Sequence, residues 1–367
     1  MNLGFAELRR TKARFASIAG AVGFIVFLAL ILSALGDGLY LGQTGIYRAS
    51  HTDLLVMTEE AELLLERSSL DPALADQVAA VEGVSEVGLL AATRLVGTDA
   101  EGTDLQLTLV GAEGAAVPSD ITEGRWPAAG TLEVVADEQM KRQGVEVGSV
   151  VTVNGGPELT VVGFARDAGY GFATLWGSME TLDQVRTEVR PELASLSGTV
   201  QAITVRTDGD PSSVATGLAN IEGAGVGTVD EAIAMIPGAE QQRTTLGAIV
   251  NTTFLVAAIV IGLFFALVTL EKRNQFAVLK AIGMSSRKLL GGVFLQAVVA
   301  SVVGYIGGLL LTRIVAAVIP AEIPALFLPS TAASVFVTTI VTGAIGALLS
   351  FRRIIKIDPA TALGGAA

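Results

Sequence analysis

Residues 246–270 read LGAIVNTTFLVAAIVIGLFFALVTL, an apolar run without a single charged side chain. A helix of this length rises far enough to cross a hydrocarbon core of about 30 Å. Three further uncharged runs of similar length lie at residues 17–36, 289–311 and 331–351. Helices this long are unusual inside a soluble domain, so the sequence predicts four transmembrane helices. The first run is interpreted as a retained anchor and not a cleaved signal peptide, because it is long and lacks a small-residue cleavage site.

Basic side chains gather in three segments that flank the apolar runs: Arg9, Arg10, Lys12 and Arg14, then Lys272, Arg273, Lys280, Arg287 and Lys288, then Arg352, Arg353 and Lys356. By the positive-inside rule these segments, and both termini with them, are predicted to be cytoplasmic. Residues 37–245 carry 32 acidic and 11 basic side chains and are predicted to lie outside. This acidic domain would repel phosphates, so nucleic acid is not an expected partner.

The predicted fold class is a membrane α-helical protein with four transmembrane helices and one α+β extracytoplasmic domain. We expect these parts: a cytoplasmic amphipathic N-terminal helix at 1–16, transmembrane helices at 17–36, 246–270, 289–311 and 331–351, the extracytoplasmic domain at 37–245, a cytoplasmic loop at 271–288, a short outer loop at 312–330 and a cytoplasmic tail at 352–367. Residues 1–16 lie on membrane lipid in this interpretation; a plain positively charged flank is the alternative.

The extracytoplasmic domain alternates helical and strand-like patterns. Strand-like runs lie at 84–90, 106–110, 132–135, 150–153 and 159–164, divided by Gly, Pro and Asn turns. Asp71-Pro72 predicts a helix over residues 73–81, with Asp as the N-cap and Pro at the first helical position. The pattern recurs from Asp210-Pro211 to Ile221-Glu222-Gly223, which suggests two helix–strand units that pack as a pair; chance similarity is the alternative. Residues 144–153 are typical of a small β-barrel-like module.

Neither catalytic residues, a resident cofactor nor a metal site is predicted. The sequence has no Cys, no phosphate-binding Gly-x-x-x-x-Gly-Lys-[Ser/Thr] loop, no Gly-x-Ser-x-Gly and no His-Glu-x-x-His. Its one histidine, His51, is interpreted as a surface or capping residue, because a metal site needs further ligands. We therefore expect a protein that is not an enzyme by itself.

Small residues spaced four apart predict close helix–helix contacts in the membrane. Gly304 and Gly308 have this spacing in the third run, Gly343 with Ala347 in the fourth, and Ala16 with Gly20 and Ala19 with Gly23 around the first. Glycines that merely face lipid are the alternative.

The loop at 271–288 reads as a short amphipathic helix, a Gly stop and a Ser cap before the next span. Four apolar residues are expected to be exposed in it: Phe276, Leu279, Ile282 and Met284. Apolar side chains ringed by charge suggest docking to a partner protein. The alternative is an interfacial helix that lies on lipid.

The same loop, from Glu271 through Leu279-Lys280-Ala281-Ile282-Gly283 to Met284, resembles the signature loop of the FtsX/MacB-type ABC permeases. The Asp358-Pro359 segment near the C-terminus resembles that family's closing motif, and the layout of one span, a large domain and three spans is also similar. The resemblance implies a homodimeric permease that works with a separate cytoplasmic ABC ATPase. It implies that force passes to the domain through Phe276, Leu279, Lys280, Ala281, Gly283 and Met284.

A narrower resemblance, to the HrtB subfamily of haem-exporting permeases, rests on residues 7–15, 33–39, 239–241 and 364–366. It implies a hydrophobic or amphipathic substrate, with haem as the leading candidate. Haem needs an axial donor, and the expected donors at the outer membrane edge are Glu240, Tyr40 and Tyr47, with Met235 as a soft second donor. A solvated charge at Glu240 and a core-filling role for Met235 are the alternatives. Two other functions stay open: an FtsX-like mechanotransmitter that controls a cell-wall hydrolase, and a lipoprotein-release permease.

Overall fold

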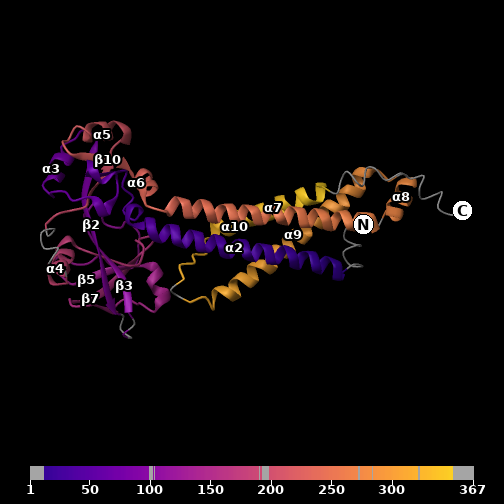
Figure 1. Cartoon of the computed structure of the whole chain (residues 1–367), viewed down its shortest axis with the longest axis horizontal. Coiled ribbons are helices and arrows are strands. Elements are labelled where there is room, and N and C mark those ends of the chain that lie inside the picture. The colour runs from indigo at the N-terminus through magenta and orange to yellow at the C-terminus, as the bar shows by residue number, and fades with distance from the viewer. Residues whose placement is uncertain are drawn as a thin grey trace. The chain divides into compact units, whose positions relative to one another are not determined.

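The computed structural model describes residues 12–98, 102, 104–189, 191, 198–271, 273–282, 284–320 and 323–349. These residues form two compact units, one built from the residues up to Gly38 and from Arg243 onward, the other from Leu39–Gln242 (Figure 1). Gly283, the tail at 352–367 and most of the predicted N-terminal helix at 1–16 lie outside the described residues. The predicted limits of the domain at 37–245 stay a prediction about where the chain leaves the membrane.

Among the described residues, four long helices lie mostly or wholly in the first unit, together with one short helix, α8 (Figure 1). Their bounds are α2 Lys12–Arg48, α7 Ala239–Glu271, α8 Arg273–Ala281, α9 Ser286–Ala316 and α10 Pro329–Leu349. All four long helices are long and apolar enough to cross a membrane, which confirms the predicted fold class; the predicted bounds of the spans stay a prediction. Helix α2 continues well past residue 36 and α7 begins ahead of residue 246, and no proline interrupts either segment.

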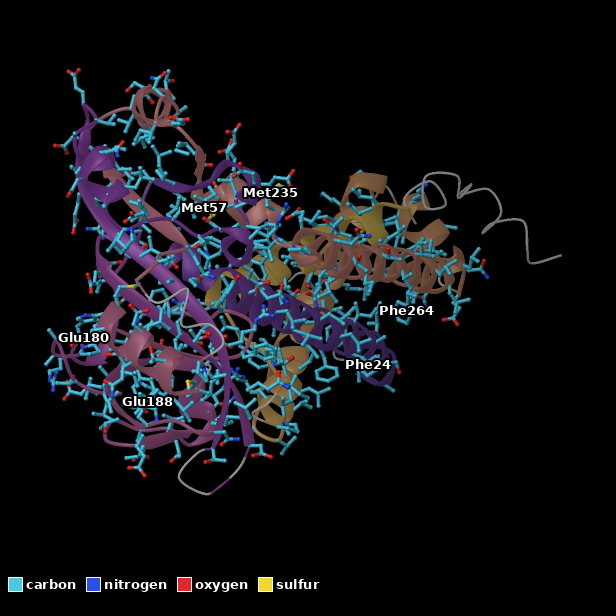
Figure 2. The ribbon with its side chains drawn as sticks, turned by 60° about the vertical axis from the view of Figure 1, so that its left-hand side comes forward. Phe24, Met57, Glu180, Glu188, Met235 and Phe264 are labelled. Carbon is cyan, nitrogen blue, oxygen red and sulfur yellow. The ribbon has the colours of Figure 1, made fainter. Side chains whose placement is uncertain are left out.

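The bundle has an apolar interior and an apolar exterior. Its interior includes Val26, Ile261 and Ala297, contributed by α2, α7 and α9. Its exterior carries exposed side chains such as Phe24, which is 56% exposed and projects from α2 in Figure 2. Large apolar surface of this kind marks a contact with lipid or protein, so the bundle is built for a membrane.

Glycines bring the bundle helices close together. A Cβ atom on Gly308 would lie 2.5 Å from the Gly23 carbonyl oxygen of α2, and one on Gly304 would lie 2.9 Å from the Ala19 oxygen. On α10, a Cβ atom on Gly343 would crowd the Ser301 side chain of α9. Of the two pairs expected around the first run, Ala19 and Gly23 lie at the contact with α9, whereas nothing among the described residues lies within 4 Å of Gly20.

The second unit is an α+β domain, as predicted, with one ten-stranded mixed sheet. The strand order is β10-β1-β9-β2-β3-β8-β5-β7-β4, and β6 pairs with both β2 and β7. The strands are β1 Leu54–Thr58, β2 Val84–Thr98, β3 Asp104–Gly114, β4 Ile121–Gly124, β5 Glu133–Asp137, β6 Val150–Val153, β7 Glu158–Ala165, β8 Ala173–Gly177, β9 Ala202–Thr207 and β10 Ala224–Thr228. The helices are α3 Leu74–Ala79, α4 Met179–Val189, α5 Pro211–Leu218 and α6 Val229–Met235, with 3₁₀ turns at Glu59–Ala61, Leu65–Arg67 and Glu138–Gln143.

One half of the sheet explains the repeated sequence pattern. Strands β1, β2, β9 and β10 pair antiparallel in the order β10-β1-β9-β2, with α3 after β1 and α5 after β9, which is a ferredoxin-like arrangement of two split β-α-β units. Asp210 caps α5 by accepting a hydrogen bond from the Ser212 backbone nitrogen, and Pro211 is the first helical residue. The helix predicted over 73–81 is shorter, since Asp71 instead closes a turn by accepting from the Ala73 nitrogen at 2.9 Å.

The other half closes into a small barrel. Strand β6 pairs with the end of β2, where Gly97 faces Val153, and also with β7, so the strands β2-β3-β8-β5-β7-β6 form a ring. The barrel-like module predicted at 144–153 is thus present. Strand β2 extends far beyond the predicted run at 84–90, because its first part belongs to the ferredoxin-like half and its last part to the barrel.

The last turns of α2 are embedded in this domain. Ile46 and Tyr47 are buried in a core cluster of the unit, and the Gly42 carbonyl oxygen accepts a hydrogen bond from the Gly171 nitrogen at 2.7 Å. Gly45 faces the turn after β7 so closely that a Cβ atom would lie 2.5 Å from both the Asp167 oxygen and the Gly169 nitrogen. The turn at 167–169 therefore packs closely against the end of α2.

The domain also holds a buried carboxyl group, Asp137, at the end of β5. It is 4% exposed and accepts a hydrogen bond from the Ala168 nitrogen at 3.3 Å. Burial, with a smaller contribution from the charge of Asp167, raises the pKa of Asp137 from 3.8 to about 7. Between about pH 4 and pH 7 the folded chain therefore keeps a proton on Asp137 that the unfolded chain releases.

We therefore expect stability to fall as the pH rises from about 4 to about 7, and to level off above that range. The melting temperature of the full-length chain, followed by tryptophan fluorescence from the buried Trp176, should be lower at pH 8 than at pH 5. In Asp137→Asn, whose amide does not titrate, this difference should shrink. An unchanged difference in that variant would show that another group carries the pH dependence.

Candidate functional site

The short helix α8 is anchored by one face. Phe276 is 7% exposed and Ala277 is fully buried, both in the core cluster of the bundle, and Leu279 and Met284 pack half-buried against the same cluster. The expectation that Phe276 is exposed is therefore wrong. Both faces of this helix carry apolar residues, and the face with Phe276 belongs to the buried cluster that also contains Leu289 of α9.

The opposite face of α8 presents an exposed apolar pair. Val278 is 49% exposed and Ile282, directly after the helix, is 78% exposed. Residues four apart lie on the same side of a helix, so the two side chains are neighbours. Ile282 was predicted to be exposed, whereas Val278 was missed, although its spacing from Ile282 was the signal that could have found it. Lys280 is half-buried, and Ala281 ends the helix.

A rigidly held helix with exposed branched apolar side chains is suited to docking. The buried face fixes α8 to the bundle, so a push on the exposed face is passed to α7 and α9, which flank it in the chain. Exposed apolar pairs of this kind become favourable only when a partner covers them.

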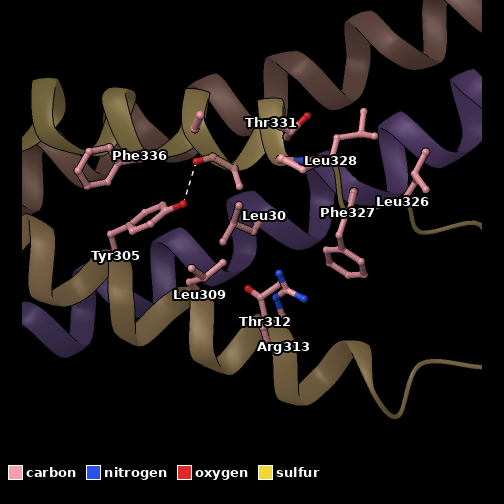
Figure 3. Close-up of a pocket in the computed structure, with 14 residues that line it drawn as sticks. Leu30, Tyr305, Leu309, Thr312, Arg313, Leu326, Phe327, Leu328, Thr331 and Phe336 are labelled. Carbon is pink, nitrogen blue, oxygen red and sulfur yellow. Dashed lines mark hydrogen bonds between the residues drawn. The ribbon is translucent and has the colours of Figure 1, made fainter.

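A cavity of about 530 Å³ lies in the same unit, between α2, α9 and the start of α10 (Figure 3). Its walls are apolar and come from three separate parts of the chain: Leu30, Tyr305, Leu309, Phe327 and Phe336. Tyr305 and Phe336 meet edge to face with ring centroids 4.9 Å apart. The cavity lies within the size range of small-molecule sites, which is about 300–1,000 Å³.

Polar contacts fix the walls of this cavity. The Tyr305 hydroxyl donates to the Ala332 oxygen at 2.9 Å, the dashed line in Figure 3. The Thr331 hydroxyl donates to an Asp37 carboxylate oxygen at 2.5 Å. Arg313 extends from α9 towards α2 and brings a guanidinium group to the apolar hollow (Figure 3). A flat or elongated apolar molecule with one acidic group matches these walls.

None of the four residues expected from the sequence to bind substrate lines this cavity. Glu240, in the first turn of α7, and Met235, at the end of α6, are exposed. Tyr40 is half-buried, and Tyr47 is a core residue whose hydroxyl oxygen accepts a hydrogen bond from the Leu65 nitrogen at 3.4 Å. Tyr47 is therefore not the exposed donor that the sequence suggested, because the end of α2 is embedded in the domain.

His51 is exposed, and its Nδ1 lies 3.0 Å from the Ser119 hydroxyl oxygen. In the part of the chain that the structure describes, no three His, Cys, Asp or Glu side chains converge as metal ligands would.

Comparison with known proteins gives matches along the whole chain. Residues 248–359 match the FtsX-like permease C-terminal family. A Staphylococcus epidermidis protein named as the HrtB permease of a hemin transport system is 23% identical over 366 residues, which cover 100% of this chain and 99% of the relative. An uncharacterized ABC transporter permease of Mycobacterium tuberculosis is 27% identical over 377 residues, which cover 98% of this chain and 99% of the relative.

Two solved structures align with about half of the chain. The periplasmic region of MacB from Actinobacillus actinomycetemcomitans has 14% identity and a TM-score of 0.37, and covers 51% of this chain and 91% of its own. The extracellular domain of the noncanonic ABC-type transporter YknZ from Gram-positive bacteria has 17% identity and a TM-score of 0.35, and covers 48% of this chain and 98% of its own. Helix α8, and the α9 and α10 walls of the 530 Å³ cavity, lie inside the segment that matches the permease family.

Proposed function

We propose that this chain, an ABC transporter permease with an FtsX-like C-terminal domain, works with a separate cytoplasmic ATPase to export a hydrophobic or amphipathic substrate. The observation that carries the proposal is the exposed pair Val278 and Ile282 on a helix whose other face is locked into the bundle. In this proposal ATP-driven closure of the ATPase pushes on α8, and the long helices α2 and α7 carry the movement into the Leu39–Gln242 domain.

The proposed location is the cell membrane, with both termini and α8 in the cytoplasm and the domain outside. The basic residues around α8 support this orientation, since short cytoplasmic loops carry an excess of Lys and Arg. The acidic composition of residues 37–245 is compatible with it.

The proposed working form is a homodimer. One face of α2 supports it: nothing among the described residues lies within 4 Å of Gly20, and the nearby Phe24 is exposed. A second copy would bury this face, and the glycine would let the two backbones approach closely.

Haem is the leading candidate for the substrate. The name of the Staphylococcus epidermidis relative supports it, and so does an apolar cavity with Arg313 near it, since haem is a flat apolar ring with acidic propionate groups. The exposed carboxylate of Glu240 and the phenol of Tyr40 stay the iron donors that the sequence suggests; both belong to the Leu39–Gln242 unit and neither lines the apolar cavity. Tyr47 is left out of this set because it is buried.

Purification of the tagged full-length chain from its native membranes in mild detergent tests the proposal. The preparation should contain an ABC ATPase, identified by mass spectrometry, and its ATP hydrolysis should rise several-fold when hemin is added. Arg313→Gln and Glu240→Ala should each reduce the rise without changing the basal rate.

The outcomes separate the two parts of the proposal. Absence of any co-purifying ATPase would overturn the permease–ATPase assignment. An ATPase that responds to other amphiphiles, but not to hemin, would remove haem and leave the exporter in place.

A further inference from the structure

The Leu39–Gln242 domain contains a second cavity, of about 310 Å³, at the end of α2. In contrast to the apolar cavity of the bundle, it is lined by charged groups from three parts of the chain: Arg48 and His51 at the end of α2, Asp120 ahead of β4, and Arg166 and Asp167 in the turn after β7. Neither the permease fold nor the proposed export accounts for a charged hollow in this place.

Arg48 is the unusual member of this set. Its Nε and Nη2 atoms are buried, yet neither has a hydrogen-bond partner among the described residues. Burying two guanidinium nitrogens without hydrogen bonds is unfavourable, because these atoms have lost their water and gained no acceptor. Such an orphaned group in a folded protein points to a partner that binds from outside the chain.

The other two basic side chains of the cavity, Arg166 and His51, already have contacts of their own. Arg166 is already paired, since its Nη1 lies 2.9 Å from an Asp120 carboxylate oxygen, and both side chains are about half exposed. His51 uses Nδ1 to contact the Ser119 hydroxyl, which leaves Nε2 available. The deep position thus belongs to Arg48, while Arg166 and His51 lie nearer the solvent.

The backbone around the cavity is held in an unusual conformation. His51 and Asp167 have φ values of 52° and 50°, in the left-handed region that non-glycine residues rarely adopt. Strained residues of this kind gather at binding and catalytic sites, where the surrounding structure holds them. Two of them lining one cavity agree with a site that is shaped in advance for a ligand.

We propose that this cavity binds a small molecule with one carboxylate or phosphate group, and that the Arg48 guanidinium holds this group with two parallel hydrogen bonds. The guanidinium fork matches the geometry of both anionic groups. A volume of about 310 Å³ exceeds that of a bare ion, since one water occupies about 30 Å³, so the ligand has a body as well as a charge.

The Asp167 side chain brings a negative charge to the cavity, and this charge limits the classes of ligand that can bind there. The Asp167 carboxylate lines the same cavity and has no ion-pair or hydrogen-bond partner among the described residues. It would repel a polyanion and accept a hydrogen bond from a hydroxyl or ammonium group. A hydroxy acid, an amino acid or a small phosphate monoester with a free hydroxyl therefore fits better than citrate or a nucleotide.

The test uses the full-length chain in detergent, with glycerol 3-phosphate, L-lactate and inorganic phosphate as probes and chloride to match ionic strength. At least one of the three should raise the melting temperature in a concentration-dependent way. Arg48→Met should weaken the apparent affinity at least tenfold, and Arg48→Lys should weaken it less. Arg67→Met, which removes an exposed arginine paired with Glu62 elsewhere on the domain, should leave it unchanged.

A second readout, taken without any probe, separates a binding role from a structural one. If Arg48 is unpartnered in the free protein, Arg48→Met removes a buried charge and should leave the melting temperature equal or higher. A marked fall would mean that Arg48 is paired within the chain, and would overturn the proposal. Absence of a shift with all three probes up to 100 mM, or equal affinity in Arg48→Met, would overturn it as well.

Discussion

Gly45→Ala is expected to destabilise the Leu39–Gln242 domain by about 2–3 kcal/mol, the upper part of the range for overpacked cores. The new methyl carbon would lie 2.5 Å from the Asp167 oxygen and 2.5 Å from the Gly169 nitrogen, far inside normal contact. Both are backbone atoms of a turn that packs against the end of α2, so neither can move aside as a flexible side chain would. The helix or the turn must shift instead, and their contact is lost.

Gly42→Ala is the matched control, because it makes the same change one turn earlier on the same helix. A Cβ atom on Gly42 meets nothing closer than the Gln139 side-chain nitrogen at 3.9 Å, an ordinary contact. Alanine is the better helix former by about 1 kcal/mol, so this variant should be neutral or slightly more stable. Thermal unfolding of the full-length chain should show a fall of roughly 4–12 °C for Gly45→Ala only. Equal melting temperatures for the two variants would mean that the turn does not grip the helix.

The same docking explains why the helix ends were harder to predict than the helices themselves. A membrane helix such as residues 246–270 can be predicted from its own segment alone, because length and lack of charge are local properties. The continuation of α2 to Arg48 depends on the domain around it: residues 37–48 contain three glycines and have no strong helix signal, and they are held by contacts with residues more than a hundred positions away. No window along the sequence contains that information.

In the sheet, too, local features could be predicted from the sequence, whereas the pairing of distant strands could not. The repeated Asp-Pro pattern predicted two helix–strand units, and β10 and β2 follow the two helices as expected. Strand order and the length of β2 could not be predicted, since both depend on pairing between distant segments, such as Gly97 with Val153. The barrel-like module was visible only through the valines of its shortest strand.

At the candidate site, the sequence predicted the short helix of the loop but not which of its side chains are exposed. Apolar residues occur on both faces of α8, so periodicity alone could not decide between Phe276 and Val278, and only the packed bundle does. The 530 Å³ cavity was missed because its walls come from α2, α9 and α10. One signal was present: Arg313 is the single basic residue between Lys288 and Arg352, in an otherwise apolar region.

Ile282→Asp is expected to have the largest effect on function: the co-purifying ATPase should be lost, with at least a tenfold fall in permease-bound ATP hydrolysis. Burying an isoleucine side chain contributes about 1.5–3 kcal/mol to a contact. Its loss alone weakens binding by tenfold or more, since a factor of ten corresponds to about 1.4 kcal/mol. A carboxylate forced into the same apolar contact adds a desolvation cost.

The bundle itself should tolerate this change, because the Ile282 side chain is 78% exposed and is not part of the buried cluster. Membrane insertion, elution volume and melting temperature should therefore match those of the unchanged protein. Gln275→Glu supplies the control for charge: Gln275 is exposed on the same helix, and the substitution adds the same negative charge without removing apolar surface. It should keep most of the bound ATPase. If Ile282→Asp retained the ATPase as well, the exposed pair on α8 would not be the docking surface, and the buried residues around Phe276 would have to act by fixing some other part of the loop.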